Sequence, residues 1–174
     1  MGSGHLRLAL EWGMAGTLLL CALSDLRHRR IPNRLVLSIA ALALLQHLLS
    51  LPLAVLWQPL AAASLAAILL FPCWHFRLLG GGDLKLFVAA ALWAGRRLPD
   101  LVLAVALAGG LLAVLWLAAD LLQRRWLRWL AALPYLAPCV PSSLTEYSQK
   151  GASLPYGVAI AAGTIGLMLG AHAG

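Results

Sequence analysis

Apolar stretches of a length suited to crossing a lipid bilayer recur from one end of the 174-residue chain to the other. A membrane-spanning helix needs about 20 apolar residues, because its backbone polar groups must be satisfied within the segment. Six stretches fit this pattern: residues 6–24, 33–51, 53–76, 82–94, 98–122 and 154–171. The sequence therefore predicts an all-α, polytopic integral membrane protein with about six transmembrane helices.

The composition excludes a soluble globular protein. Hydrophobic residues make up 62% of the chain, charged residues only 11%, and the mean hydropathy is +0.88. A secretory signal would account for one apolar stretch near the N-terminus but not for six. No internal repeat separates one part from another, so residues 1–174 are expected to form a single membrane-embedded domain.

The distribution of basic residues predicts the orientation in the membrane. If the N-terminus lies outside, ten of the thirteen lysines and arginines fall on the cytoplasmic side, as the positive-inside rule requires. Both termini then lie outside. The net charge of +7 is explained by contact with anionic lipid headgroups, and no nucleic-acid partner is predicted. The ten cytoplasmic residues are Arg27, Arg29, Arg30, Arg34, Arg77, Lys85, Arg124, Arg125, Arg128 and Lys150.

With this topology, the six acidic residues separate into groups. Asp25 follows the first predicted span and Asp83 opens the fourth, both at the cytoplasmic edge, whereas Glu11 and Asp100 lie towards the outside. Asp120 is also near the inner edge. It lies in a plain helical context, four residues before Arg124, and is interpreted as a helix-surface ion pair.

Asp25 lies in the stretch SDLRHRRIPN. Ser24 and Asp25 are expected to end the first helix, and a basic turn follows. Pro32 and Asn33 then open the second helix, Pro32 with its preset φ and Asn33 as a side-chain cap. A purely structural alternative is that Asp25 balances the neighbouring arginines.

Asp83 follows three consecutive glycines, Gly80, Gly81 and Gly82. Glycine is entropically costly, so a run of three predicts either positive φ or a close approach to the backbone, for example by an extended substrate strand. The alternative is a tight turn between two spans. Lys85 is interpreted as a positive anchor at the cytoplasmic boundary, with a contact to substrate as the alternative.

Two carboxylates at one membrane edge suggest peptide-bond hydrolysis. An ionised carboxylate can take a proton from water while a protonated one donates to the carbonyl oxygen and then to the leaving amine. Neither a metal nor a cofactor is needed. No Ser/His/Asp set, HExxH motif or phosphate-binding loop competes with this interpretation, and Cys21, Cys73 and Cys139 form no CxxC pair.

Three motifs, in order, resemble those of the type IV prepilin peptidases, membrane aspartic proteases with a GxGD motif. Residues 80–86, GGGDLKL, are similar to the family's GxGDxKL, and Asp25 with RHRRIPN is similar to its first aspartate motif. The third match is LPYGVAI, residues 154–160, which includes Pro155, Tyr156 and Gly157.

The resemblance implies a multi-pass enzyme of the bacterial inner membrane. Such an enzyme cleaves the short basic leader from prepilin or pseudopilin substrates at the cytoplasmic face, with Asp25 and Asp83 as the catalytic pair. Larger family members also methylate the new N-terminus and carry paired CxxC motifs. This chain has none and resembles the short form of Flp-type tight-adherence pilus systems, so cleavage without methylation is expected.

Two other functions are compatible with membrane-embedded acids. Presenilin-like proteases share the GxGD motif, but their first aspartate follows Tyr and their third motif is Pro-Ala-Leu, whereas this chain has Ser24 and Pro155-Tyr156-Gly157. A small transporter or channel subunit would place its carboxylates near the bilayer midplane. Asp25 and Asp83 lie at predicted helix ends instead.

Overall fold

The computed structural model describes residues 2–131 and 156–173, and within these residues all regular structure is helical. The α-helices are α1 (Gly2–His28), α2 (Asn33–Ser50), α3 (Trp57–His75), α4 (Gly81–Ala94), α5 (Leu98–Ala131) and α7 (Tyr156–Ala173). Two short 3₁₀ helices, η1 (Leu53–Val55) and η2 (Gly95–Arg97), precede α3 and α5.

The described residues belong to two compact units, each considered by itself. The first contains residues 2–109 and 156–173, and the second contains residues 110–131, the remainder of α5. All of the motif residues described below belong to the first unit.

The helices of the first unit end where the sequence forces a change of backbone direction. α1 ends at His28, and the next residue, Arg29, has φ of +50° while its N–H donates to the carbonyl of Asp25 at 2.9 Å. The helix therefore continues past Ser24 and Asp25, contrary to the sequence-based prediction. α4 ends at Gly95, whose φ of +54° is readily adopted by glycine.

The core of this unit lies where α1, α2, α4 and α7 meet. α4 packs against α2, α3 and α7, and α1 packs against α2 and α7. α4 contributes Leu86 and three consecutive buried alanines, Ala89, Ala90 and Ala91, to the core. Small side chains allow helices in a membrane protein to approach closely, which suits α4 to its central place.

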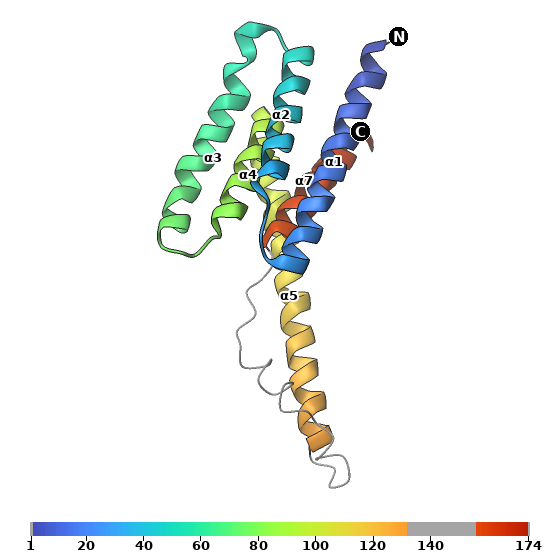
Figure 1. Cartoon of the computed structure of the whole chain (residues 1–174), viewed down its shortest axis with the longest axis vertical. Helices are drawn as coiled ribbons and strands as arrows, with labels where there is room; N and C mark the ends of the chain where they lie inside the picture. The colour runs from blue at the N-terminus through green and yellow to red at the C-terminus, as the bar shows by residue number, and fades with distance from the viewer. Residues whose placement is uncertain (1, 132–155, 174) are drawn as a thin grey trace. The chain divides into compact units, whose positions relative to one another are not determined.

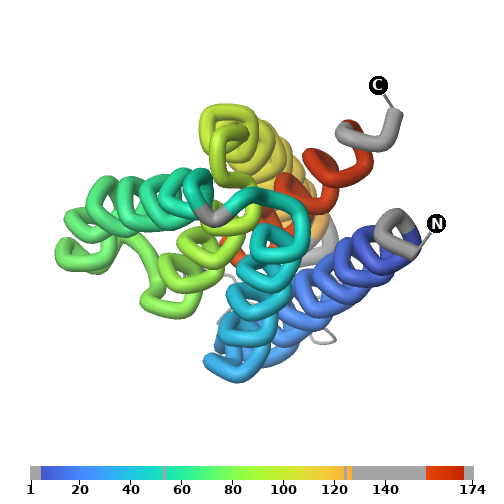
Figure 2. The backbone as a smooth tube through the Cα atoms, turned by 90° about the horizontal axis from the view of Figure 1, so that it is seen from above, coloured from blue at the N-terminus to red at the C-terminus, as the bar shows by residue number. Residues whose placement is uncertain are grey.

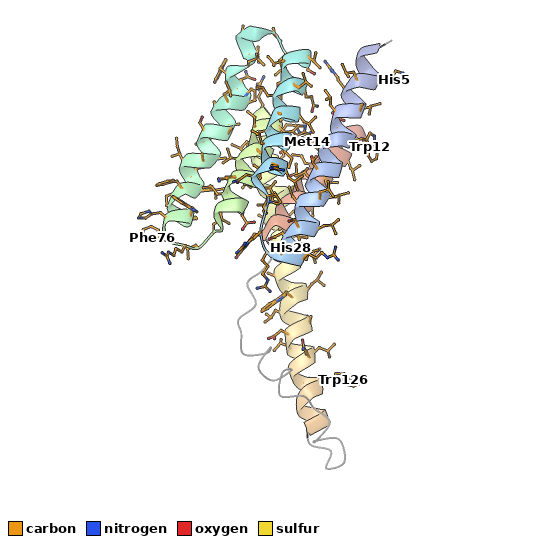
Figure 3. All side chains as sticks on the ribbon, in the orientation of Figure 1. His5, Trp12, Met14, His28, Phe76 and Trp126 are labelled. Carbon is orange, nitrogen blue, oxygen red and sulfur yellow. The ribbon has the colours of Figure 1, made fainter. Side chains whose placement is uncertain are left out.

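The views of the first unit agree with these contacts. Figure 1 shows α7 alongside α1, and Figure 2 shows α3 and α1 on opposite sides of α2 and α4. His28, at the end of α1, and Phe76, after α3, lie at the same end of the unit in Figure 3, far from His5. The α1–α2 and α3–α4 turns therefore share one end.

Among the described residues, four helical segments are long and apolar enough to span a membrane: His5–His28, Asn33–Ser50, Trp57–His75 and Gly81–Gln123. Tyr156–Gly170 is a shorter apolar helix. The predicted fourth and fifth spans both fall within the apolar segment 81–123. Gly95, with its positive φ, separates the two helices of this segment. The predicted third span begins later than expected, because η1 precedes α3, and α5 extends beyond residue 122 to Ala131.

Candidate aspartate site

Asp25 occupies the last turn of α1 and is 7% exposed. Its Oδ2 accepts a hydrogen bond from the backbone N–H of Gly157 at 2.9 Å. Gly157 is the second residue of α7, so the carboxylate of one helix lies at the positive end of another. A β-carbon added at Gly157 would lie 2.8 Å from this oxygen, which explains why glycine suits the position.

Asp83 lies in the first turn of α4, where Gly80 is the N-cap residue. Its carboxylate accepts a hydrogen bond from the backbone N–H of Gly80, the reciprocal bond of a capping box. The other oxygen, Oδ1, is buried and has no hydrogen-bond partner among the described residues. Buried carboxylate oxygens are rarely left unpaired, so this atom is the candidate contact for a water molecule or a substrate group.

The fold brings the two aspartates together. Their carboxylates are close enough to repel each other electrostatically. Ile31, in the turn between α1 and α2, connects their surroundings, because it lies against both Gly82 and Gly157. The sequence predicted that Asp25 and Asp83 share one edge of the membrane domain, and the structure places them in one cluster at one end of the first unit.

The glycine run allows neighbouring side chains to approach the backbone closely. None of Gly80, Gly81 and Gly82 has positive φ, and the last two lie within α4. Their open faces are covered by the protein itself: a β-carbon at Gly81 would lie 3.2 Å from Nε1 of Trp74, and one at Gly82 would lie 3.2 Å from Cβ of Ile31. Side chains of the protein itself therefore make the close approach to Gly81 and Gly82, and an approach by a substrate strand stays a prediction.

Asn33 and Lys85 contact each other. Pro32 is the N-cap residue of α2, and Asn33 is its first helical residue, so the predicted side-chain cap by Asn33 is wrong. Instead, Oδ1 of Asn33 accepts a hydrogen bond from Nζ of Lys85 at 3.2 Å. This bond joins the first motif to the second at the exposed rim of the aspartate site.

The third motif is described only in part. Pro155 lies outside the described residues, whereas Tyr156 begins α7 and is 44% exposed. Tyr156 lines an apolar cavity of about 470 Å³ together with Leu79, which precedes the glycine run. The second and third motifs therefore border a common apolar space as well as the aspartates.

The other acids of the first unit lie elsewhere. Glu11 accepts a hydrogen bond from Gln46 at 3.0 Å, and Asp100 forms an exposed ion pair with Arg97 at 3.5 Å. Asp120 belongs to the second unit, and the side chain of its predicted partner Arg124 lies outside the described ones.

The side chain of Cys21 is fully buried in the core, where a free cysteine packs as a small hydrophobic residue. Cys139 lies outside the described residues. No cluster of three or more possible metal ligands occurs within the described part of the chain.

Ile31 was not singled out by the sequence. The sequence nevertheless contained a hint of its role. Two glycines in the motifs, Gly82 and Gly157, indicate that a side chain or a substrate must approach the backbone closely at both positions. A single sequence does not reveal that one side chain approaches both.

Comparison with known proteins shows the family to which the chain belongs. Residues 12–117, more than half of the chain and including both Asp25 and Asp83, match the model of the type IV leader peptidase family. The third motif lies beyond the matched range. No curated protein and no solved structure is significantly similar to the chain. The family match nevertheless identifies the chain as a member of the type IV leader peptidase family.

Proposed function

We propose that this protein is an aspartic endopeptidase that removes leader peptides from prepilin-like substrates, with Asp25 and Asp83 as its catalytic pair. The family match supports a protease of the type IV leader peptidase kind. The observation that carries the assignment of residues is the meeting of two carboxylates from helices distant in sequence, one of which has a buried oxygen, Oδ1 of Asp83, without a partner.

The chemistry follows from two carboxylates that hold one proton between them. The ionised aspartate takes a proton from a water molecule, and the resulting hydroxide adds to the peptide carbonyl carbon. The protonated aspartate gives its proton to the carbonyl oxygen. Collapse of the tetrahedral intermediate breaks the C–N bond, and the proton taken from water passes to the leaving amine. The former carbonyl oxygen returns its proton to the aspartate that supplied it, so the pair again holds one proton.

The site is proposed to face the cytoplasm. The end of the first unit that carries the aspartates also carries six exposed basic residues, whereas the described basic residues towards the opposite end are Arg7, Arg96 and Arg97. This asymmetry supports the positive-inside orientation, with the arginines against anionic headgroups of the bacterial inner membrane. The six are Arg27, Arg29, Arg30, Arg34, Arg77 and Lys85.

The full topology remains part of the proposal. Six spans with both termini outside require α4 and α5 to cross separately, with the chain reversing at Gly95, and α7 to cross in its short apolar length. Reporter fusions test this arrangement: fusions after Arg30 and Gly80 should report the cytoplasm, and fusions after Leu51 and Arg97 the outside.

The substrates are proposed to be prepilins of the Flp type, cleaved without methylation of the new N-terminus. The absence of a CxxC pair from the chain supports the second part. Mass spectrometry of a pilin matured by this protein alone should find a free N-terminal amine, and an enzyme-dependent mass increase of one methyl group would contradict it.

Co-expression with a prepilin from the same genome tests the main proposal. The wild-type protein should produce the shorter mature pilin, and Asp25→Asn and Asp83→Asn should each leave the precursor uncut. Asp120→Asn is the matched control, since the same change is made at an aspartate of the second unit, and it should cleave normally. Cleavage by either Asp25→Asn or Asp83→Asn would show that the catalytic carboxylates are elsewhere.

A further inference from the structure

Ile31 lies between the first turns of two helices. A β-carbon added at Gly82, in α4, would lie 3.2 Å from Cβ of Ile31, and one added at Gly157, in α7, would lie 3.0 Å from its Cδ1. Both distances are shorter than ordinary van der Waals contact. The absence of a side chain at both glycines is therefore what makes room for Ile31.

Each contact of Ile31 is next to a catalytic candidate. Gly82 directly precedes Asp83, and the N–H of Gly157 is bonded to Oδ2 of Asp25. Movement of Ile31 against α4 would displace the backbone that carries Asp83. Movement against α7 would displace the N–H that holds Asp25.

The turn that carries Ile31 is itself tied to α1. The N–H of Arg29 donates to the carbonyl of Asp25 at 2.9 Å, and Oγ of Ser24 donates to the carbonyl of Arg30 at 2.8 Å. Pro32 follows with its φ of −63°. The backbone is thus restrained on both sides of Ile31. This restraint is needed if Ile31 is to fix the distance between α4 and α7.

We propose that Ile31 is a positioning residue that sets the separation of Asp25 and Asp83 by filling the gap between Gly82 and Gly157. The inference rests on the proposed function of the two aspartates, but its geometric content can be measured without any cleavage. Its purely structural alternative is that Ile31 adds only apolar packing, as any partly buried isoleucine does.

Two substitutions shorten the side chain of Ile31 in steps. Ile31→Val keeps Cβ, which faces Gly82, and removes Cδ1, which faces Gly157. Ile31→Ala removes the side chain beyond Cβ. Because small misplacements of reacting groups lower the rate of the chemical step, kcat should fall about threefold in the first variant and more than about tenfold in the second, with little change in KM.

Ile39 provides the matched control. It is fully buried in α2, and the atoms nearest to a β-carbon added at Gly82 or Gly157 belong to other residues. Ile39→Ala and Ile39→Val should reduce the amount of folded protein but leave kcat per folded molecule unchanged. Equal loss of kcat at positions 31 and 39 would reduce Ile31 to ordinary packing and overturn the inference.

The separation itself can be measured by cross-linking in the full chain. Asp25→Cys and Asp83→Cys are introduced after the native cysteines at 21, 73 and 139 are replaced by alanine, and the rate of disulfide formation is followed under a mild oxidant. Ile31→Ala should increase this rate at least about threefold, because the spacer that holds the two positions apart is shortened, whereas Ile39→Ala should not.

The outcomes distinguish the two proposals. An unchanged cross-linking rate in Ile31→Ala overturns the positioning role even if Asp25→Asn and Asp83→Asn abolish cleavage. An increased rate supports it even if those two variants still cleave, in which case the catalytic assignment fails instead, and a decreased rate overturns it.

Discussion

The two turns at the aspartate-bearing end of the first unit place their aspartates in different electrostatic surroundings. The α3–α4 turn delivers Asp83 to the start of a helix, where a carboxylate is favoured by the helix dipole and bonds to the N–H of its own N-cap, Gly80. The α1–α2 turn follows Asp25, which lies at the end of a helix, where a carboxylate is disfavoured.

Asp25 is compensated by a different helix. Its hydrogen-bond donor, Gly157, lies 132 residues further along the chain, at the start of α7. The hydrogen bond from Gly80 to Asp83 can therefore form as soon as α4 forms, whereas the hydrogen bond from Gly157 to Asp25 requires α7 to pack against α1. The candidate site is complete only when the last described helix is in place.

In catalysis, unlike in their surroundings, the two aspartates should be equally necessary. Members of a catalytic unit are strongly non-additive, so Asp25→Asn, Asp83→Asn and the double variant should each lower kcat/KM by at least about 1000-fold, the double hardly more than either single. Initial rates on a purified prepilin in detergent measure this. A double variant much worse than both singles would mean that the aspartates act separately.

The next largest effect is expected at the non-local contact. Gly157→Ala places a β-carbon 2.8 Å from Oδ2 of Asp25 and 3.0 Å from Ile31, so the carboxylate must rotate away from its amide donor. A misplacement of this kind should lower kcat about 100-fold. Folding should be little affected, because alanine is the better helix former.

Gly166, in the same helix, is the control for this substitution. A β-carbon there meets nothing within 4 Å. Gly166→Ala should keep full activity. It should also raise the thermal midpoint of unfolding slightly, because replacing glycine by alanine within a helix stabilises it by up to about 1 kcal/mol. If Gly157→Ala and Gly166→Ala have the same activity, Asp25 does not depend on α7.

A smaller effect is expected at the local contact. A β-carbon at Gly80 would lie 2.7 Å from Oδ2 of Asp83, but that oxygen ends a flexible side chain, and the φ of −67° and ψ of 142° at Gly80 suit alanine. Only the aspartate needs to move, whereas at Gly157 Ile31 is also in the way. Gly80→Ala should lower kcat about tenfold, measured in the same assay, and a larger loss than that of Gly157→Ala would reverse the comparison.

The same difference explains how far the site could be predicted from the sequence. Asp83 with its glycines is a local pattern, and both the helix start after Gly80 and the need for close approach could be predicted from it. The residues that approach, Trp74 and Ile31, could not, because Trp74 comes from the end of α3 and Ile31 from the α1–α2 turn. The amide of Gly157 belongs to a motif that the sequence identified, but nothing in that motif shows that it holds Asp25.

The helical fold could be predicted from the sequence, but the ends of the helices could not. Apolar stretches must be helical in a bilayer, which predicted the elements. Their ends depend on single turns: the bond from Arg29 to Asp25 extends α1 beyond Ser24, and α5 continues to Ala131, beyond the predicted end of the fifth span at residue 122. Such local competition is not resolved by hydropathy.

The smallest expected effect concerns the bond that links the two turns directly, from Lys85 to Asn33. Both side chains are exposed, and exposed charged contacts contribute about 0.2–1 kcal/mol. Lys85→Met and Asn33→Ala should therefore each lower kcat/KM by no more than about fivefold, and the double variant should equal the worse single, because the second change finds the bond already broken. Losses that multiply would show that the two side chains act independently. A loss from Lys85→Met comparable with that of Gly157→Ala would show that Lys85 contacts the substrate, and the site would then extend to its exposed rim.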